Sequence, residues 1–192
     1  MNVFYLHPDP TVCAQMHIDK HVVKMAIEYA QILSTAHRVV DGDLWYGRTT
    51  NGRKIARWFH PDYELNMTLY KATHPSHPST VWARSSEANY TWLFDMWTAL
   101  CSEYTYRYNK THESFRKLEH ALLIPPLKIE KTGFTQPPPA MKDFSQCIVE
   151  GNSIESYRNY YWEAKRPFAK WTTREIPRWW IDKHNEWKRQ QA

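Results

Sequence analysis

The sequence is short of the features that mark several protein classes. Its 192 residues include only three cysteines, and Cys13, Cys101 and Cys147 are isolated, with no CxxC pair. Isolated cysteines supply neither a disulfide framework nor a cysteine-based zinc site, so we expect a reducing, cytoplasmic setting. No apolar run approaches the length of a membrane span, and the first residues lack the pattern of a signal peptide, so we expect no membrane partner.

Internal repeats and the strict alternation of apolar and polar residues that is typical of strands are also missing. The length suits one domain with a sizeable core. We therefore predict an all-α fold, a single domain over residues 1–192 built around a buried central helix. The proline-rich residues 124–151 are predicted to form a long irregular loop, which in a compact domain is usually functional or loosely ordered. The other predicted elements are helices over 61–72, 85–108, 111–122, 152–164 and 178–189, and a loop over 44–57 that mixes aromatic and basic residues.

The central helix is predicted to run from Asp9 to Arg38. Asp9 is a typical N-cap, Pro10 suits the first helical position, and no glycine or further proline follows before Gly42. On a wheel of about 100° per residue, polar residues share one narrow stripe and apolar residues cover most of the rest, which is typical of a buried helix. This stripe, the polar seam, comprises His17, Lys20, His21, Lys24, Glu28, Gln31, Thr35 and Arg38.

The polar seam allows two interpretations, a solvated strip or the lining of a cleft. Glu28 lies one turn from Lys24, so the two form either a plain ion pair or an acid/base pair, in which Lys24 could also attack a sugar aldehyde. His17 and His21 have the i,i+4 spacing of two metal ligands on one helical face. The sequence has no HExxH glutamate and no acidic cluster, however, so we expect no metal and no other cofactor.

The chain is basic and rich in aromatic residues, with a net charge of +5, ten Trp and twelve Tyr. Aromatic residues interleaved with Arg and Lys can stack on bases while the cations hold phosphates, although they can also simply fill a core. Arg84, just before a predicted helix, would oppose the helix dipole there, which favours another anion as its partner. We predict a nucleic-acid partner. The expected contact residues are Arg38, Arg84, Arg158, Lys165, Arg166, Lys170, Trp171 and Arg174.

Several short motifs occur in an order found in a known family. They are the segment Met1–Pro8, a first helix that ends near Ala30–Gln31, His77–Pro78 before an aromatic and basic stretch, a long helix that ends in Glu103, Arg107 and Tyr108, and the aromatic run Tyr157–Lys165. In these motifs the chain resembles the pyrimidine-dimer DNA glycosylases of the endonuclease V type.

The resemblance implies a small α-helical repair enzyme that binds damaged duplex DNA on a basic concave face. It implies that an N-terminal α-amine, of Met1 or of a processed Asn2, attacks the sugar C1′ to form a Schiff base, and that β-elimination then cleaves the strand. The assisting carboxylate of that family aligns with Lys24 or Ala26, and Glu28 lies one turn further on.

We therefore predict a DNA glycosylase and abasic-site lyase that works through an amine and a helix carboxylate. Two alternatives stay open, a non-catalytic nucleic-acid-binding protein and a metal-dependent hydrolase that uses His17 and His21. The candidate catalytic residues are Met1, Asn2, His17, His21, Lys24 and Glu28.

Overall fold

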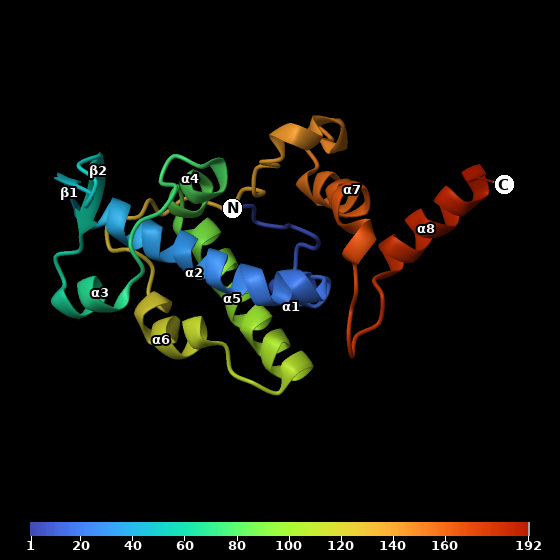
Figure 1. Ribbon diagram of the computed structural model, residues 1–192, viewed down its shortest axis with the longest axis horizontal. Coiled ribbons are helices and arrows are strands. Elements are labelled where there is room, and N and C mark those ends of the chain that lie inside the picture. The colour runs from blue at the N-terminus through green and yellow to red at the C-terminus, as the bar shows by residue number, and fades with distance from the viewer. Residues whose placement is uncertain (192) are drawn as a thin grey trace.

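Two long helices cross at the centre of the computed structural model, which describes residues 1–191 (Figure 1). Helix α2 (Asp19–Val40) packs against α5 (Glu87–Tyr108), and α4 and α6 pack against α2. The chain is mostly helical, which confirms the predicted fold class in its coarser form. The other helices are α1 (Pro10–Gln15), α3 (Tyr63–Thr68), α4 (Pro78–Arg84), α6 (Glu113–Leu122), α7 (Ser153–Lys165), α8 (Arg178–Gln191) and the short 3₁₀ helices η1 (Lys142–Cys147) and η2 (Arg166–Phe168).

The predicted helix from Asp9 to Arg38 is in fact two helices. Asp9 caps α1 as predicted, with its carboxylate accepting the backbone N–H of Val12. That helix ends at Gln15, and α2 begins at Asp19 after Ile18, which has extended φ and ψ angles of −65° and 155°. A single continuous helix was therefore a wrong prediction. The break changes the helical register, so His17 does not lie on the stripe that the later seam residues share.

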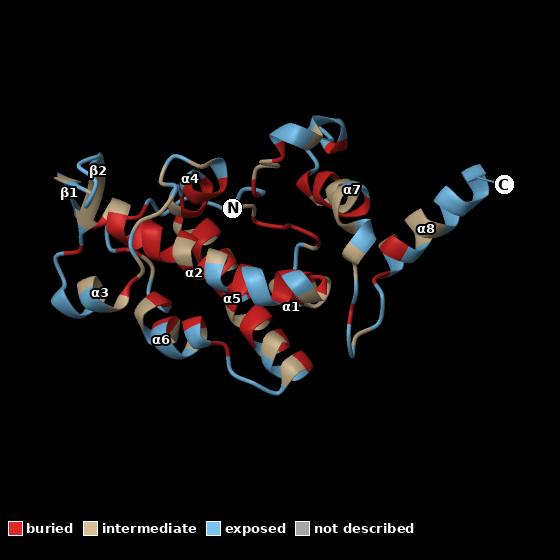
Figure 2. Ribbon diagram, viewed as in Figure 1, coloured by how far each residue is buried: buried red, intermediate tan, exposed pale blue. Residues whose placement is uncertain are grey.

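The burial of α2 changes along its length (Figure 2). Every residue from Ile32 to Arg38 is buried, so the second half of the helix lies inside the molecule. The first half keeps an exposed side, which includes Val23, Ile27 and the two lysines of the polar seam. The two lysines of the seam therefore lie at the surface, Thr35 and Arg38 lie in the interior, and the partly buried Glu28 lies between them.

A two-stranded antiparallel sheet lies where a loop was predicted. Strands β1 (Asp43–Arg48) and β2 (Lys54–Phe59) pair along their full lengths. Asn51 and Gly52 occupy the hairpin tip, where Gly52 has a left-handed φ of 81° that costs a glycine little, whereas Gly47 lies within β1. The flanking aromatic and β-branched residues favour strands. The hairpin projects from one end of the molecule, and α8 lies at the other (Figure 1).

Capping residues set most other helix boundaries close to the predicted ones. Ser86 caps α5 and Asn152 caps α7, each with a side-chain oxygen that accepts a backbone N–H of the first turn. The helix predicted over 61–72 is the shorter α3. Helix α4 was missed, although His77 caps it and Pro78 opens it. Residues 124–151 contain no element except η1, in agreement with the predicted loop.

One hydrophobic core joins these elements, from Val3 near the N-terminus to Trp180 in α8. The N-terminal segment Val3–Leu6 is buried in it, with the Phe4 ring stacked on His21 at a centroid distance of 4.3 Å. Within residues 1–191, no helix combines the length and the apolar character that crossing a membrane requires.

Candidate functional site

An amine and a carboxylate meet where the N-terminal segment passes helix α2. The N-terminal nitrogen of Met1 lies 3.9 Å from Glu28 Oε2, and Lys24 Nζ lies 3.2 Å from Glu28 Oε1. The side chains of Met1 and Glu28 are 7% and 17% exposed, whereas that of Lys24 is 68% exposed. Glu28 therefore lies between a sheltered ammonium group and a solvated one. We call Met1 N and the Glu28 carboxylate the amine–carboxylate pair.

The fold holds this amine in place through Phe4, three positions further on. Phe4 lies in the buried segment, and its backbone N–H donates a hydrogen bond of 3.1 Å to the hydroxyl of Tyr29 in α2. Tyr29 follows Glu28 directly in the sequence. The same short piece of α2 therefore supplies both the carboxylate and an anchor for the chain end.

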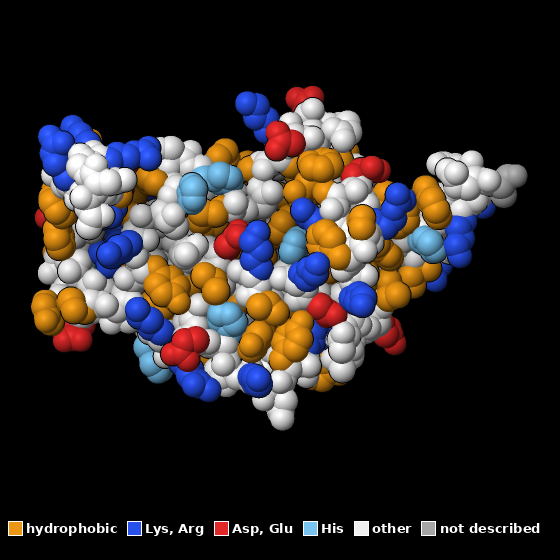
Figure 3. Space-filling view, viewed as in Figure 1, with side chains coloured by type: hydrophobic (Ala, Val, Ile, Leu, Met, Phe, Trp, Pro, Cys, Tyr) orange, Lys and Arg blue, Asp and Glu red, His pale blue; other side chains and the backbone are white. Residues whose placement is uncertain are grey.

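A histidine at the start of α4 shares the electrostatic environment of this pair. Burial lowers the pKa of His77, the positive charges of the N-terminal amine and of His74 lower it further, and Glu28 raises it. Its Nδ1 accepts the backbone N–H of Ser79, which closes the first turn of α4. Figure 3 shows histidine side chains gathered over α4. A neutral imidazole near the amine is suited to exchanging protons. The sequence signal for this residue was the pair His77–Pro78, which we used as a motif of the family resemblance and not as a candidate site.

Two polar atoms in neighbouring segments lack partners. Within residues 1–191, Arg84 Nη1 and Asn2 Oδ1 are buried without a hydrogen bond. Arg84 ends α4, where a cation suits the helix dipole, so the prediction that it opposes a dipole was wrong. An unpaired buried N–H is costly and calls for an explanation, and a guanidinium is well suited to a phosphate.

His17 and His21 lie in the interior, away from the open part of the polar seam. His17 Nδ1 donates to the backbone oxygen of Cys13 at 2.8 Å, and its Nε2 accepts from the Tyr29 hydroxyl at 3.0 Å. His21 Nδ1 lies 2.6 Å from the hydroxyl of Tyr161. Because both nitrogens of His17 are already bonded in the core, the geometry does not favour the alternative of a metal-ligand pair or the predicted catalytic role of these rings.

The buried histidines are expected to make the free energy of unfolding depend on pH. Burial is the main cause that lowers the pKa of His17 and His37 from 6.5 to about 4 and that of His21 to about 2. Between pH 6.5 and 4 the unfolded chain therefore binds more protons than the folded one, so the free energy of unfolding falls as pH falls. The slope is about 1.4 kcal/mol per pH unit for each such histidine.

Urea titrations at pH 7, 6 and 5 should show this loss. Replacing His37 by glutamine should reduce the slope by about one proton, or about 1.4 kcal/mol per pH unit. A free energy of unfolding that stays constant over this range would contradict the prediction.

A second polar cluster joins the end of α2 to the end of β2. The ligand atoms of His37, Asp41 and His60 lie within 4.8 Å of one another, and all three residues are buried. Within residues 1–191, His37 Nδ1 and His60 Nε2 have no hydrogen-bond partner. His60 Nδ1 accepts the N–H of Asp62, so a neutral ring carries its proton on Nε2, which faces Asp41 Oδ2 at 3.8 Å.

In this protonation form His60 offers a metal no lone pair at Nε2. The cluster suits a proton or a bridging water better than a metal ion. The sequence did not show that these three residues lie together, because His37 lies in α2, Asp41 directly after α2, and His60 directly after β2. Asp41 also accepts the backbone N–H groups of Leu127 and Lys128 at 2.7 and 2.9 Å, which fixes the start of the long loop.

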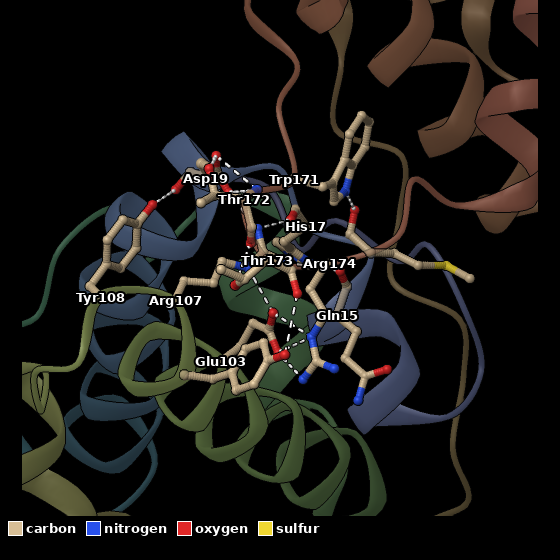
Figure 4. A network of polar contacts seen from close by, with 12 residues as sticks. Gln15, His17, Asp19, Glu103, Arg107, Tyr108, Trp171, Thr172, Thr173 and Arg174 are labelled. Atoms are coloured by element: carbon tan, nitrogen blue, oxygen red, sulfur yellow. Dashed lines mark hydrogen bonds and ion pairs between the residues drawn. The ribbon is translucent and has the colours of Figure 1, made fainter.

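The C-terminal segment is attached by a network of charged groups (Figure 4). Arg107 donates to Glu103 at 2.7 Å and to Asp19 at 2.8 Å, and Arg174 donates to Glu103 at 2.8 Å. The buried Trp171 donates its indole N–H to the backbone oxygen of Met16 at 2.9 Å. Arg174 and Trp171 therefore hold the segment against the α1–α2 junction, and their predicted role in binding nucleic acid stays a prediction that this geometry does not favour.

Other predicted contact residues also have structural partners. Arg38 is buried and donates to carbonyl oxygens of the 58–70 region, including those of Trp58, Tyr70 and Leu69. Arg158 donates to the backbone oxygen of Leu6. These two arginines hold parts of the chain together, so the geometry does not favour them as DNA contacts, and that role stays a prediction.

The remaining cations of the C-terminal stretch are more accessible. Lys165 donates to the hydroxyl of Tyr160 at 3.0 Å and lies over its ring. Arg166 and Lys170 are exposed, and the Arg166 guanidinium lies over the rings of Trp162 and Trp187. Of the predicted C-terminal surface, these side chains stay available to a partner.

Comparisons with protein-family models, with curated proteins and with solved structures found no match for this chain. The resemblance to the pyrimidine-dimer glycosylases therefore stays a prediction. Within residues 1–191, the geometry offers an N-terminal amine 3.9 Å from the Glu28 carboxylate, a histidine, His77, whose pKa is lowered, and one guanidinium nitrogen of Arg84 without a hydrogen-bond partner.

Proposed function

We propose that the protein is a DNA glycosylase and abasic-site lyase in which the α-amine of Met1 is the nucleophile and Glu28 assists it. The observation that supports this most directly is the distance of 3.9 Å between Met1 N and Glu28 Oε2 in a sheltered position. Met1 supplies this amine, so the proposal uses Met1 rather than a processed Asn2. The three cysteines are free and buried, which fits the cytoplasmic setting that we propose.

The chemistry begins with the amine. It gives up a proton, for which Glu28 is the adjacent acceptor, and its lone pair bonds to the sugar C1′. The bond from C1′ to the base breaks, and the base leaves with the electron pair and takes up a proton. Opening of the sugar ring leaves a Schiff base between C1′ and the amine nitrogen.

Strand cleavage follows by β-elimination. Loss of a proton from C2′ expels the 3′ phosphate, and water then hydrolyses the Schiff base to release the amine. Because its pKa is lowered, His77 is neutral and can take up a proton, so we assign it as the base that removes the C2′ proton. Once Glu28 has passed the proton of the amine to the leaving base, its carboxylate stabilises the positive charge of the Schiff base.

Reduction with borohydride tests the nucleophile. Wild-type protein incubated with duplex DNA that contains an abasic site should form a covalent adduct, because borohydride reduces the Schiff base to a stable amine. Peptide mass spectrometry should place the adduct on Met1. A variant that carries several extra residues ahead of Met1 should form none, whereas Lys24→Ala should still form it.

The outcomes separate the candidate functions. An adduct on Lys24 would show that the nucleophile is the exposed amine of Lys24 and not the α-amine of Met1. Tight binding to DNA without any adduct would favour the alternative of a non-catalytic nucleic-acid-binding protein. A requirement for metal would favour the hydrolase, which the bonded ring of His17 does not support.

A further inference from the structure

We propose that the β1–β2 hairpin is an arm that enters a groove of duplex DNA. This inference extends the proposed function, because it names how the substrate is held. The hairpin spans residues 43–59 and contains one acidic residue, Asp43, at its base. Its cations are Arg48, Arg53, Lys54 and Arg57.

These cations are free of the carboxylate partners that engage the C-terminal arginines. Within residues 1–191, none of the ion pairs includes a hairpin residue. Arg48, Arg53 and Lys54 are exposed, and the guanidinium groups of Arg48 and Arg57 bond only to carbonyl oxygens of the hairpin itself. Figure 3 shows basic side chains gathered at this end of the molecule. An unneutralised basic projection is suited to phosphates.

Aromatic side chains accompany the cations and stay open to solvent. Tyr46 is 59% exposed with Lys54 Nζ lying 4.2 Å from its ring centre. Trp45 and Phe59 stack on each other at 5.4 Å and are both exposed. Exposed large aromatic residues in a group mark an interaction site rather than a core.

The register places a cation and an aromatic residue on each face of the hairpin. Side chains of cross-strand partners share a face, and successive residues alternate. Trp45 pairs with Arg57 on one face, and Arg48 pairs with Lys54 on the other, beside Tyr46. A sheet that lies flat on a membrane or on one apolar partner needs only one such face. A two-stranded ribbon that carries a cation and an aromatic residue on each face is suited to a groove, because a groove has a wall on either side. The major groove of DNA, about 12 Å wide, admits such a ribbon.

The base of the arm is fixed to the helix that carries the amine–carboxylate pair. A Cβ atom at Gly42 would lie 2.4 Å from the backbone oxygen of Arg38, so only glycine allows this close approach. The Arg38 guanidinium also donates to the Trp58 oxygen at 3.0 Å. From Glu28 to Val40 the helix advances about 18 Å at 1.5 Å per residue, which is about half a turn of B-DNA. The arm and the amine can therefore act on neighbouring grooves of one duplex.

Two charge-matched double variants test the arm. In Arg48→Ala/Lys54→Ala the hairpin loses two cations, and in Arg166→Ala/Lys170→Ala the C-terminal surface loses two. Affinity for a duplex with an abasic site is measured against salt concentration, together with the melting temperature of each variant. The hairpin variant should bind about 100-fold more weakly at 0.1 M salt, and its slope of log affinity against log salt should fall by about two. The C-terminal variant should change both much less.

A third variant separates the aromatic contact from charge. Tyr46→Ala should lose about 10-fold in affinity with the salt slope unchanged, because packing of an aromatic ring against base edges and thymine methyls in the groove releases no counterion. Unaltered affinity and slope in the hairpin double variant, or a wild-type protein that does not bind duplex DNA, would overturn the arm.

Borohydride trapping keeps this result distinct from the proposed function. With saturating DNA the hairpin variant should still form the adduct, because its amine is intact. A salt effect without any adduct in the wild type would leave the arm standing and remove the lyase. An adduct in the wild type, together with an unchanged salt slope in the hairpin variant, would support the lyase and remove the arm.

Discussion

Replacing Glu28 by glutamine is expected to lower the rate of base release and strand cleavage by about 10²- to 10⁴-fold, the usual contribution of a positioned acid or base. Glutamine keeps the shape of the side chain but neither accepts the proton of the amine nor stabilises the cationic Schiff base. Single-turnover assays on a duplex with the damaged or abasic site measure the chemical step apart from binding.

Folding and DNA affinity should stay close to those of the wild type. The ion pair that Glu28 makes with the largely exposed Lys24 contributes no more than about 1 kcal/mol. Glu113→Gln is a suitable control, because its carboxylate is 80% exposed in another surface pair. If Glu28→Gln unfolds, the residue is structural, and if it keeps full activity, the proposed chemistry is wrong.

Replacing Arg107 by methionine is expected to lower the free energy of unfolding by about 3–5 kcal/mol. The Arg107 side chain is fully buried and donates to Glu103, to Asp19 and to backbone oxygens of the α1–α2 junction. Without it, two carboxylates and these oxygens lose a donor. The melting temperature of a domain this size should then fall by about 10 °C or more.

An exposed pair provides the matched control. Arg116 lies 3.6 Å from Glu113, with both side chains largely exposed, so Arg116→Met should change stability by no more than about 1 kcal/mol. Denaturant titrations of both variants measure the difference directly. Equal effects would mean that the buried network contributes little to the fold.

Sequence patterns predicted the local features of this fold well. Asp9 caps α1 as predicted, and Asn152 caps the helix predicted over 152–164, because a capping bond is made within one turn. The break before Asp19 could not be predicted, because the partners of Asp19 are remote in the sequence. Its carboxylate accepts from Arg107 and from the backbone N–H of Thr172, and its own N–H donates to the backbone oxygen of Lys170. Remote partners of this kind leave no mark on the local pattern.

In the candidate site too, the sequence indicated features within one helix but not contacts between remote segments. Glu28 and Lys24 were found from their spacing on one helix. The C-terminal cations were chosen for their aromatic neighbours, and the carboxylate that engages Arg174 comes from α5, far away in the sequence. The hairpin was predicted as a loop because its charged residues and turn residues interrupt the alternation typical of strands. The pairing of Trp45 with Arg57 is therefore not evident from the sequence.

The anchored chain end has an entropic consequence for catalysis. Chain ends ordinarily fray, but here the buried Val3–Leu6 segment immobilises the residues behind the amine. A lysine nucleophile would have to restrict a long side chain that carries about 2 kcal/mol of rotamer entropy. A backbone amine has no side-chain torsions between it and the fold. In the proposed enzyme, folding itself therefore places the nucleophile, and little ordering is left for the moment of reaction.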